Sequence, residues 1–307
     1  MFAKILVPLD GSALAECALT PALTLAQAAR GHVILLRAPE ASLVYLPETE
    51  GHNLPVPEQA WDHPTADCQE YLGNFRYRYG RSFPDLKIET RINHGDAAAV
   101  IVDTAVDEDV DLIVMSTHGY SGFSRWLLGS VTERVLRHAP CPVLVVRGQR
   151  PVANVLITLD GSALSESALE PGMAVARAYG AKVTLLRVET AMELVDVREV
   201  AAIDKVEPGL GEQLLQSFFN QTETYLEDVA RRYRHAGVLL QIAEAQGLAA
   251  QQILHFAESQ QIDLIVMATH GRSGLSRWVY GSVTEKVLRH TDSALLIVRP
   301  PAHMLKE

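Results

Sequence analysis

The chain repeats itself at a spacing of about 150 residues, and no other feature constrains its fold as strongly. Residues 111–147, DLIVMSTHGYSGFSRWLLGSVTERVLRHAPCPVLVVR, match residues 263–299, DLIVMATHGRSGLSRWVYGSVTEKVLRHTDSALLIVR, at 25 of 37 positions. Residues 4–19 match residues 154–169 at 10 of 16 positions. Because the two blocks occur in the same order, we expect two copies of one domain, 1–148 and 151–307, joined by a polar stretch, Gly148–Pro151.

Within each copy, short β-branched apolar runs alternate with helical patterns, which is typical of an α/β fold with a parallel sheet and crossover helices. In the first copy we expect strands at Lys4–Leu9, His32–Arg37, Leu86–Ile92, Leu112–Ser116 and Pro142–Arg147 and helices at Leu14–Ala29, Thr65–Tyr79, Ala97–Val106 and Leu128–His138. In the second we expect strands at Ala153–Leu159, Lys182–Arg187, Val238–Ala243, Leu264–Ala268 and Ala294–Arg299 and helices at Leu164–Ala178, Gly211–Arg234, Ala249–Ser259 and Tyr280–His290. Each copy is therefore predicted to form a five-stranded parallel sheet flanked by helices.

Composition and charge exclude several classes of function. The net charge is −10, from 27 basic and 37 acidic residues, and no basic run interrupts it, which disfavours nucleic acid or an anionic membrane as a partner. The apolar runs are too short for a membrane helix, and the N-terminus lacks the pattern of a signal peptide, so we expect a cytoplasmic protein. Cys17, Cys68 and Cys141 are scattered and odd in number, which argues against a disulfide framework and a cysteine zinc site.

Small and polar residues gather where a parallel sheet of this kind binds ligands, beyond the carboxyl ends of its strands. Asp10-Gly11-Ser12 follows the first strand, and Ser116–Gly122 follows the fourth. Gly129-Ser130 then opens the last helix. Glycine lets the backbone approach a phosphate, and a helix N-terminus offers unpaired N–H groups, so these segments and their second-copy counterparts suggest a phosphate cradle.

Each part of this cradle also has a purely structural interpretation. The sequences Ser-Val-Thr-Glu at residues 130–133 and 282–285 read as capping boxes. Asp10 and Asp160 are equally typical of turn residues, with Ser12 and Ser162 as helix caps. We interpret His118 and His270 as loop-orienting residues and Trp126 and Trp278 as packing or dimer contacts, so no catalytic residue and no metal-ligating residue is predicted.

Three segments together resemble the universal stress protein family. They are Val-Pro-Leu-Asp-Gly-Ser at the first strand, Thr-His-Gly-x9-Gly-Ser-Val-Thr-Glu after the fourth, and Pro-Val-Leu-Val-Val-Arg at the fifth. The resemblance covers nearly the whole chain twice and is to the tandem two-domain type. It implies flavodoxin-like or adenine-nucleotide α-hydrolase-like domains, an internal pseudo-dimer with antiparallel fifth strands, a homodimer of chains, and ATP binding through Gly-x2-Gly-x9-Gly-Ser/Thr.

The resemblance also implies site residues in both copies. In the first copy the ATP site would comprise Pro8, Leu9, Asp10, Ala38, Met115, Ser116, Gly119, Gly129, Ser130, Val131 and Thr132. In the second it would comprise Thr158, Leu159, Asp160, Val188, Met267, Ala268, Gly271, Gly281, Ser282, Val283 and Thr284. The first glycine of the family pattern is replaced by Ser116 and Ala268, and a left-handed backbone angle there would be strained.

The favoured hypothesis is a stress-response protein that binds ATP, with Mg²⁺ on its phosphates, and acts as a nucleotide-dependent sensor or regulator rather than an enzyme. A slow ATPase or self-phosphorylating protein is the first alternative, although no base is spaced to activate water. An interaction module whose pockets no longer bind ligand is the second.

Overall fold

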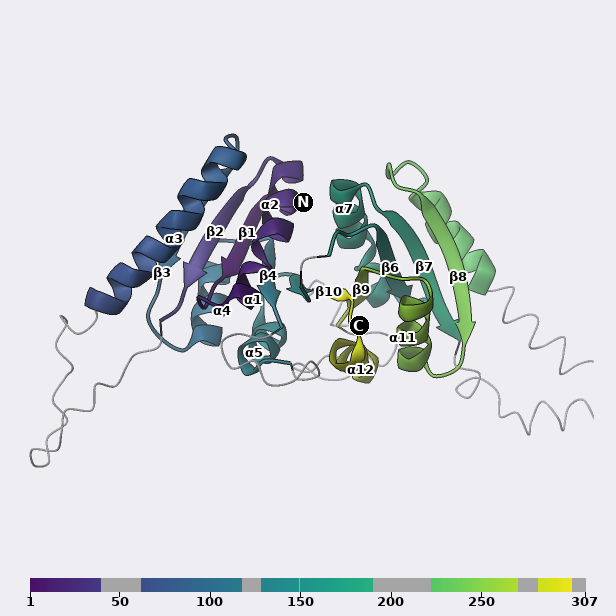
Figure 1. Cartoon of the computed structure of the whole chain (residues 1–307). Helices are drawn as coiled ribbons and strands as arrows, with labels where there is room; N and C mark the ends of the chain where they lie inside the picture. The colour runs from purple at the N-terminus through teal and green to yellow at the C-terminus, as the bar shows by residue number, and fades with distance from the viewer. Residues whose placement is uncertain (40–61, 118–127, 149, 190–221, 270–280, 300–307) are drawn as a thin grey trace, which may run out of the picture. The chain divides into compact units, whose positions relative to one another are not determined.

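A computed structural model of the chain describes residues 1–39, 62–117, 128–148, 150–189, 222–269 and 281–299 (Figure 1). The chain divides into two compact units, Met1–Gly148 and Gln149–Glu307. The two copies differ most in sequence at residues 39–64 and 190–208, and these stretches lie almost wholly outside the described residues. None of the helices described has the length and apolarity needed to cross a membrane.

Each unit contains the five parallel strands that the repeat predicts, flanked by helices. Unit 1 comprises β1 (Lys4–Pro8), α1 (Ala13–Glu16), α2 (Leu19–Ala29), β2 (His32–Arg37), α3 (Asp62–Ser82), β3 (Lys87–Ile92), α4 (Ala97–Asp107), β4 (Leu112–Ser116), α5 (Ser130–His138) and β5 (Val143–Val146). Unit 2 comprises β6 (Asn154–Leu159), α6 (Ala163–Glu166), α7 (Leu169–Tyr179), β7 (Lys182–Glu189), a helix at 222–232, β8 (Leu240–Gln246), α11 (Ala249–Ser259), β9 (Leu264–Ala268), α12 (Ser282–His290) and β10 (Ala294–Val298).

The strand order places the switch point of each sheet beside its first strand. Unit 1 has the order β3-β2-β1-β4-β5, and unit 2 repeats it as β8-β7-β6-β9-β10. This order follows the dinucleotide-binding pattern 3-2-1-4-5 and differs from the flavodoxin order 2-1-3-4-5. The first strand therefore lies between the second and the fourth. Strands two and three are added on one side of it and strands four and five on the other.

The predicted helix at Leu14–Ala29 is wrong in one respect, because the structure breaks it into α1 and α2. Pro21 explains the break: it has no N–H to donate to the carbonyl of Cys17, and its ring would clash with that carbonyl. Pro171 stands at the same position of α7, and the second copy breaks in the same way.

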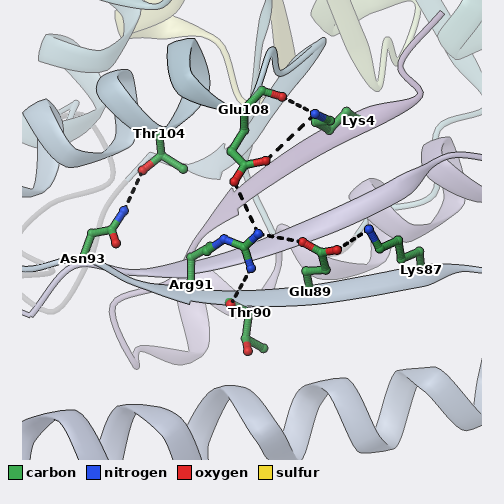
Figure 2. Close-up of polar contacts among 8 residues, drawn as sticks. All are labelled: Lys4, Lys87, Glu89, Thr90, Arg91, Asn93, Thr104 and Glu108. Carbon is green, nitrogen blue, oxygen red and sulfur yellow. Dashed lines mark hydrogen bonds and ion pairs between the residues drawn. The ribbon is translucent and has the colours of Figure 1, made fainter.

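The cores of both sheets are apolar, and all five residues of β4 and of β9 are buried. Charged side chains of unit 1 link β3, through Glu108 at the end of α4, to Lys4 of β1 (Figure 2). Arg91 Nη2 lies 2.9 Å from Glu89 Oε2 and 3.3 Å from Glu108 Oε1, and Lys4 Nζ donates to the Glu108 carbonyl. These contacts hold β3, β1 and the end of α4 together.

Candidate functional site

The carboxyl ends of β1, β2 and β4 and the start of α5 meet at the switch point of unit 1. Leu9 N donates to the carbonyl of Leu36 at 2.8 Å, which places the end of β1 beside the end of β2. Gly129 N donates to the carbonyl of Thr117 at 2.8 Å and so ties the start of α5 to the end of β4. In unit 2, Gly281 N makes the equivalent bond to Thr269 at 2.7 Å.

The first βα turn holds its aspartate in a fixed orientation. Asp10 Oδ1 accepts hydrogen bonds from Ser12 N at 2.9 Å and from Ser12 Oγ at 2.6 Å. Ser12 Oγ in turn accepts from Ala15 N at 3.1 Å and caps α1. The interpretation of Asp10 and Ser12 as turn and cap residues is thus confirmed.

The turn repeats in unit 2 with the same geometry. Asp160 Oδ1 accepts from Ser162 N at 2.9 Å and from Ser162 Oγ at 2.6 Å. Gly11 and Gly161, with φ of +86° and +84°, provide the left-handed residue that each turn needs. Each aspartate therefore stands after the first strand of its unit with Oδ1 held by the turn.

The first turn of α5 offers backbone donors. Its first intrahelical hydrogen bond runs from Glu133 N to the carbonyl of Gly129, at 2.9 Å. The N–H groups of residues 130–132 come before that bond and therefore have no partner within the helix. Ser130 is exposed at this point, and the helix dipole adds a favourable field for an anion.

The capping-box interpretation of this turn is wrong in both units. Gly129 and Gly281 are the N-cap residues and make no side-chain cap bond, while Ser130 and Ser282 stand one position inside their helices. The bond from each glycine N–H to the preceding strand end fixes the start of the helix at glycine. The serine side chain is therefore left at the exposed face of the first turn.

Thr132 and Thr284 lie beneath the helix start. Both side chains are buried, and their hydroxyls donate to the carbonyls of Ser116 at 3.0 Å and Ala268 at 3.1 Å. Each hydroxyl ties its helix to the fourth strand. Any contribution of these residues to a ligand would come from the backbone.

The remaining predicted site residues divide by exposure. Seven of them are buried: Leu9, Met115, Ser116, Thr158, Leu159, Met267 and Ala268. Five are half-buried: Pro8, Ala38, Val131, Val188 and Val283. Gly119, Gly271 and the four His and Trp residues of the same loops lie outside the described residues. Ser116 and Ala268 end extended strands and have no positive φ, so the expected backbone strain does not arise at either.

Sequence reasoning missed a second repeated cluster next to the aspartate turn. In unit 1, Arg37 Nη1 donates to the carbonyl of Leu9 at 3.1 Å, and the Tyr71 hydroxyl donates to Glu16 Oε1 at 3.1 Å. Burial, and then the charge of Glu16, raise the pKa of the Tyr71 hydroxyl, which keeps it protonated as a donor.

Unit 2 builds the same cluster from Arg187, Tyr225 and Glu166. The Tyr225 hydroxyl donates to Glu166 Oε1 at 3.1 Å, and the Arg187 guanidinium lies over the Tyr225 ring, 5.1 Å from its centroid. Burial and Glu166 likewise raise the Tyr225 pKa. The signal was available in the sequence, because the arginine and the glutamate recur at a shift of 150.

Two doubly wound α/β units, each with a reversal of strand order beside its first strand, define the class of the chain. The sequence model of the universal stress protein family matches residues 1–147 and again residues 152–299. The chain belongs to the universal stress protein family and is of its tandem type.

Similar proteins of known family support this membership. A universal stress protein of Mycolicibacterium smegmatis is 27% identical over 220 residues, which cover 70% of each chain. Another, from Mycobacterium tuberculosis strain H37Rv, is 31% identical over 211 residues, 66% of each chain. Among solved structures, a universal stress protein from Archaeoglobus fulgidus superposes with a TM-score of 0.67 at 20% identity, over 97% of this chain and 99% of that one. That likeness supports the fold alone.

Proposed function

We propose that this universal stress protein binds an adenine nucleotide, ATP first among them, at the switch point of one or both units, and that the bound nucleotide regulates its part in the stress response. The observation that carries the proposal is the first turn of α5 and of α12, where three backbone N–H groups precede the first intrahelical bond beside a capping glycine. Helix N-termini of this kind bind phosphate without a cationic side chain.

The rest of the site fits the same ligand. An oriented carboxylate at a strand end, as at Asp10 and Asp160, is suited to a ribose hydroxyl. There is space beside the backbone of Gly281, since the nearest atom to a Cβ added there would be the carbonyl oxygen of Thr269, at 3.5 Å. In a chain of net charge −10, backbone donors, the helix dipole and Mg²⁺ on the phosphates would hold the ligand.

Calorimetry on the full chain tests the proposal. ATP and AMP are titrated with and without Mg²⁺ into wild type, Gly129→Val, Gly281→Val and the double variant. We expect the double variant to lose at least roughly tenfold in affinity, because each valine methyl fills the space where the phosphate meets the N–H groups. Gly73→Val in α3 is the control, since an added Cβ there meets nothing within 4 Å.

The two alternatives give different results in the same preparations. A single-turnover rate of ATP hydrolysis above that of the solution reaction would favour the slow ATPase. Absence of heat with wild type, together with absence of nucleotide released on denaturing the purified protein, would leave the interaction module and overturn nucleotide binding.

A further inference from the structure

The arginine at the end of the second strand is repeated in the two units, but its surroundings are not. In unit 2, Arg187 Nε lies 2.8 Å from Glu189 Oε1, and the two side chains are only 13% and 11% exposed. The hydroxyl of Thr222 donates to the same carboxylate oxygen. A buried, hydrogen-bonded pair of this kind neutralises the guanidinium and fixes its direction.

Unit 1 has no acidic residue at the matching position. The shift of 150 that relates Arg37 to Arg187 places Pro39 opposite Glu189. Arg37 makes no ion pair with any other residue that the structure describes in unit 1. Its guanidinium lies over the aspartate turn instead, with Nη1 on the Leu9 carbonyl and Nη2 3.6 Å from the place where a Cβ on Gly11 would stand.

A further carboxylate lies beside the unit 2 arginine. Glu244 on β8 pairs in register with Arg187, where β3 has Ile92 opposite Arg37. Burial, and then the charges of Glu223 and Glu189, raise the Glu244 pKa, so the three glutamates lie within electrostatic reach of one another. The carboxyl edge of β7 and β8 is therefore more acidic than that of β2 and β3.

We infer that the two switch points select ligands by charge, with the unit 1 site selecting the more anionic ligand through Arg37 and the unit 2 site held indifferent to ligand charge by the Arg187–Glu189 pair. The inference rests on the proposed function and names its specificity residues. Arg37 would act as a positively charged neighbour of the phosphates or ribose bound at the Asp10 turn. Arg187 cannot do so while Glu189 holds it.

The test compares ATP with adenosine, which shares the base and ribose but carries no charge. Gly281→Val confines binding to unit 1 and Gly129→Val confines it to unit 2, each in the full chain. The quantity is the ratio of adenosine Kd to ATP Kd, measured by calorimetry in 0.05 M and 0.5 M salt. We expect this ratio to be roughly fivefold larger for unit 1 at low salt, and the difference to shrink at high salt, where charges are screened beyond about 3–5 Å.

Two substitutions exchange the behaviours. Glu189→Gln, in the Gly129→Val chain, should raise the unit 2 ratio toward that of unit 1, and Pro39→Glu, in the Gly281→Val chain, should lower the unit 1 ratio. The second variant matters because Glu189→Gln leaves a buried arginine unpaired and can destabilise unit 2. Asp228→Asn is the control of equal charge change, since Asp228 pairs with Arg231 on the exposed face of its helix.

Equal ratios in the two units, or a difference that neither substitution nor salt alters, would overturn the inference while leaving nucleotide binding intact. Absence of binding of both ligands at both sites would instead overturn the proposed function, and this inference with it.

Discussion

Thr132 and Thr284 illustrate how a residue that a family pattern assigns to a ligand also serves the fold. Each is the third residue of its helix, and each side chain is buried with its hydroxyl on the carbonyl of the last residue of the fourth strand. The pattern Gly-Ser-Val-Thr could not reveal this direction, because exposed and buried threonines have the same sequence. The direction of the threonine side chain depends on how α5 packs against the end of β4.

Thr132→Val should therefore weaken the fold of unit 1. The valine keeps the shape but leaves the Ser116 carbonyl without its side-chain donor, so we expect the free energy of unfolding to fall by about 1–2 kcal/mol. Urea denaturation followed by circular dichroism measures it. Thr132→Ser keeps the hydroxyl and is the control; a valine variant as stable as wild type would show that the bond contributes nothing.

Cys141 should be chemically inert in the folded chain. Burial, and then the nearby charge of Asp111, raise the pKa of the Cys141 thiol to about 12. Since the unfolded thiol has a pKa near 8.5, the folded state retains a proton that the unfolded state loses, and stability falls as pH rises from about 9 toward 12. Iodoacetamide labelling of a Cys17→Ser, Cys68→Ser chain at pH 8 should be slow in buffer and rapid in urea; equal rates would contradict the pKa shift.

At the scale of elements, hydrophobic alternation predicted the strands well and the ends of helices less well. All ten strands were predicted close to their observed positions, and most of them are buried β-branched runs that leave few other structures open. The partly exposed β8 was the least accurate, since it begins two residues and ends three residues later than predicted. The errors lie where one local interaction sets the end of a helix. Pro21 divides the predicted helix into two, and Gly129, not Ser130, is the N-cap residue of α5. Both depend on backbone hydrogen bonds that hydropathy does not encode.

The charged network of Figure 2 belongs to unit 1, and its contribution can be measured against unit 2. Register places neutral residues at the matching positions of unit 2: Asn154, Leu239, Gln241, Ala243 and Gln260. Glu108→Gln should lower the free energy of unfolding by about 0.5–1 kcal/mol, because Arg91 loses one of its two carboxylates at a partly exposed site.

The reverse change is the matched control. Gln260→Glu introduces a carboxylate where unit 2 supplies neither of the two cations that face Glu108, so it should not stabilise the chain. Urea denaturation in 0.05 M and 0.5 M salt checks both variants. A loss for Glu108→Gln that is unchanged by salt would mean that packing, and not charge, is responsible.

At the scale of the whole molecule, the repeat predicted two similar sites, and the structure adds that the residues around Arg37 and Arg187 differ. Arg37 and Arg187 both end the sequence Leu-Leu-Arg, and the replacement of Pro39 by Glu189 two residues later can be read from the repeat alone. The second difference, Ile92 opposite Arg37 and Glu244 opposite Arg187, depends on strand register. The contribution of Glu244 can therefore be predicted only after the sheet is known.

The same organisation predicts that each half folds alone. Unit 1 and unit 2 each have a five-stranded sheet with a fully buried fourth strand, and each has the size of an ordinary domain. Residues 1–148 and 149–307, expressed separately, should each unfold in one cooperative transition by circular dichroism and calorimetry. Residues 1–117 serve as the control, because they lack α5 and β5 and leave one edge of β4 without its strand partner. A half that shows no cooperative transition, when the full chain does, would mean that its core is completed by the other unit.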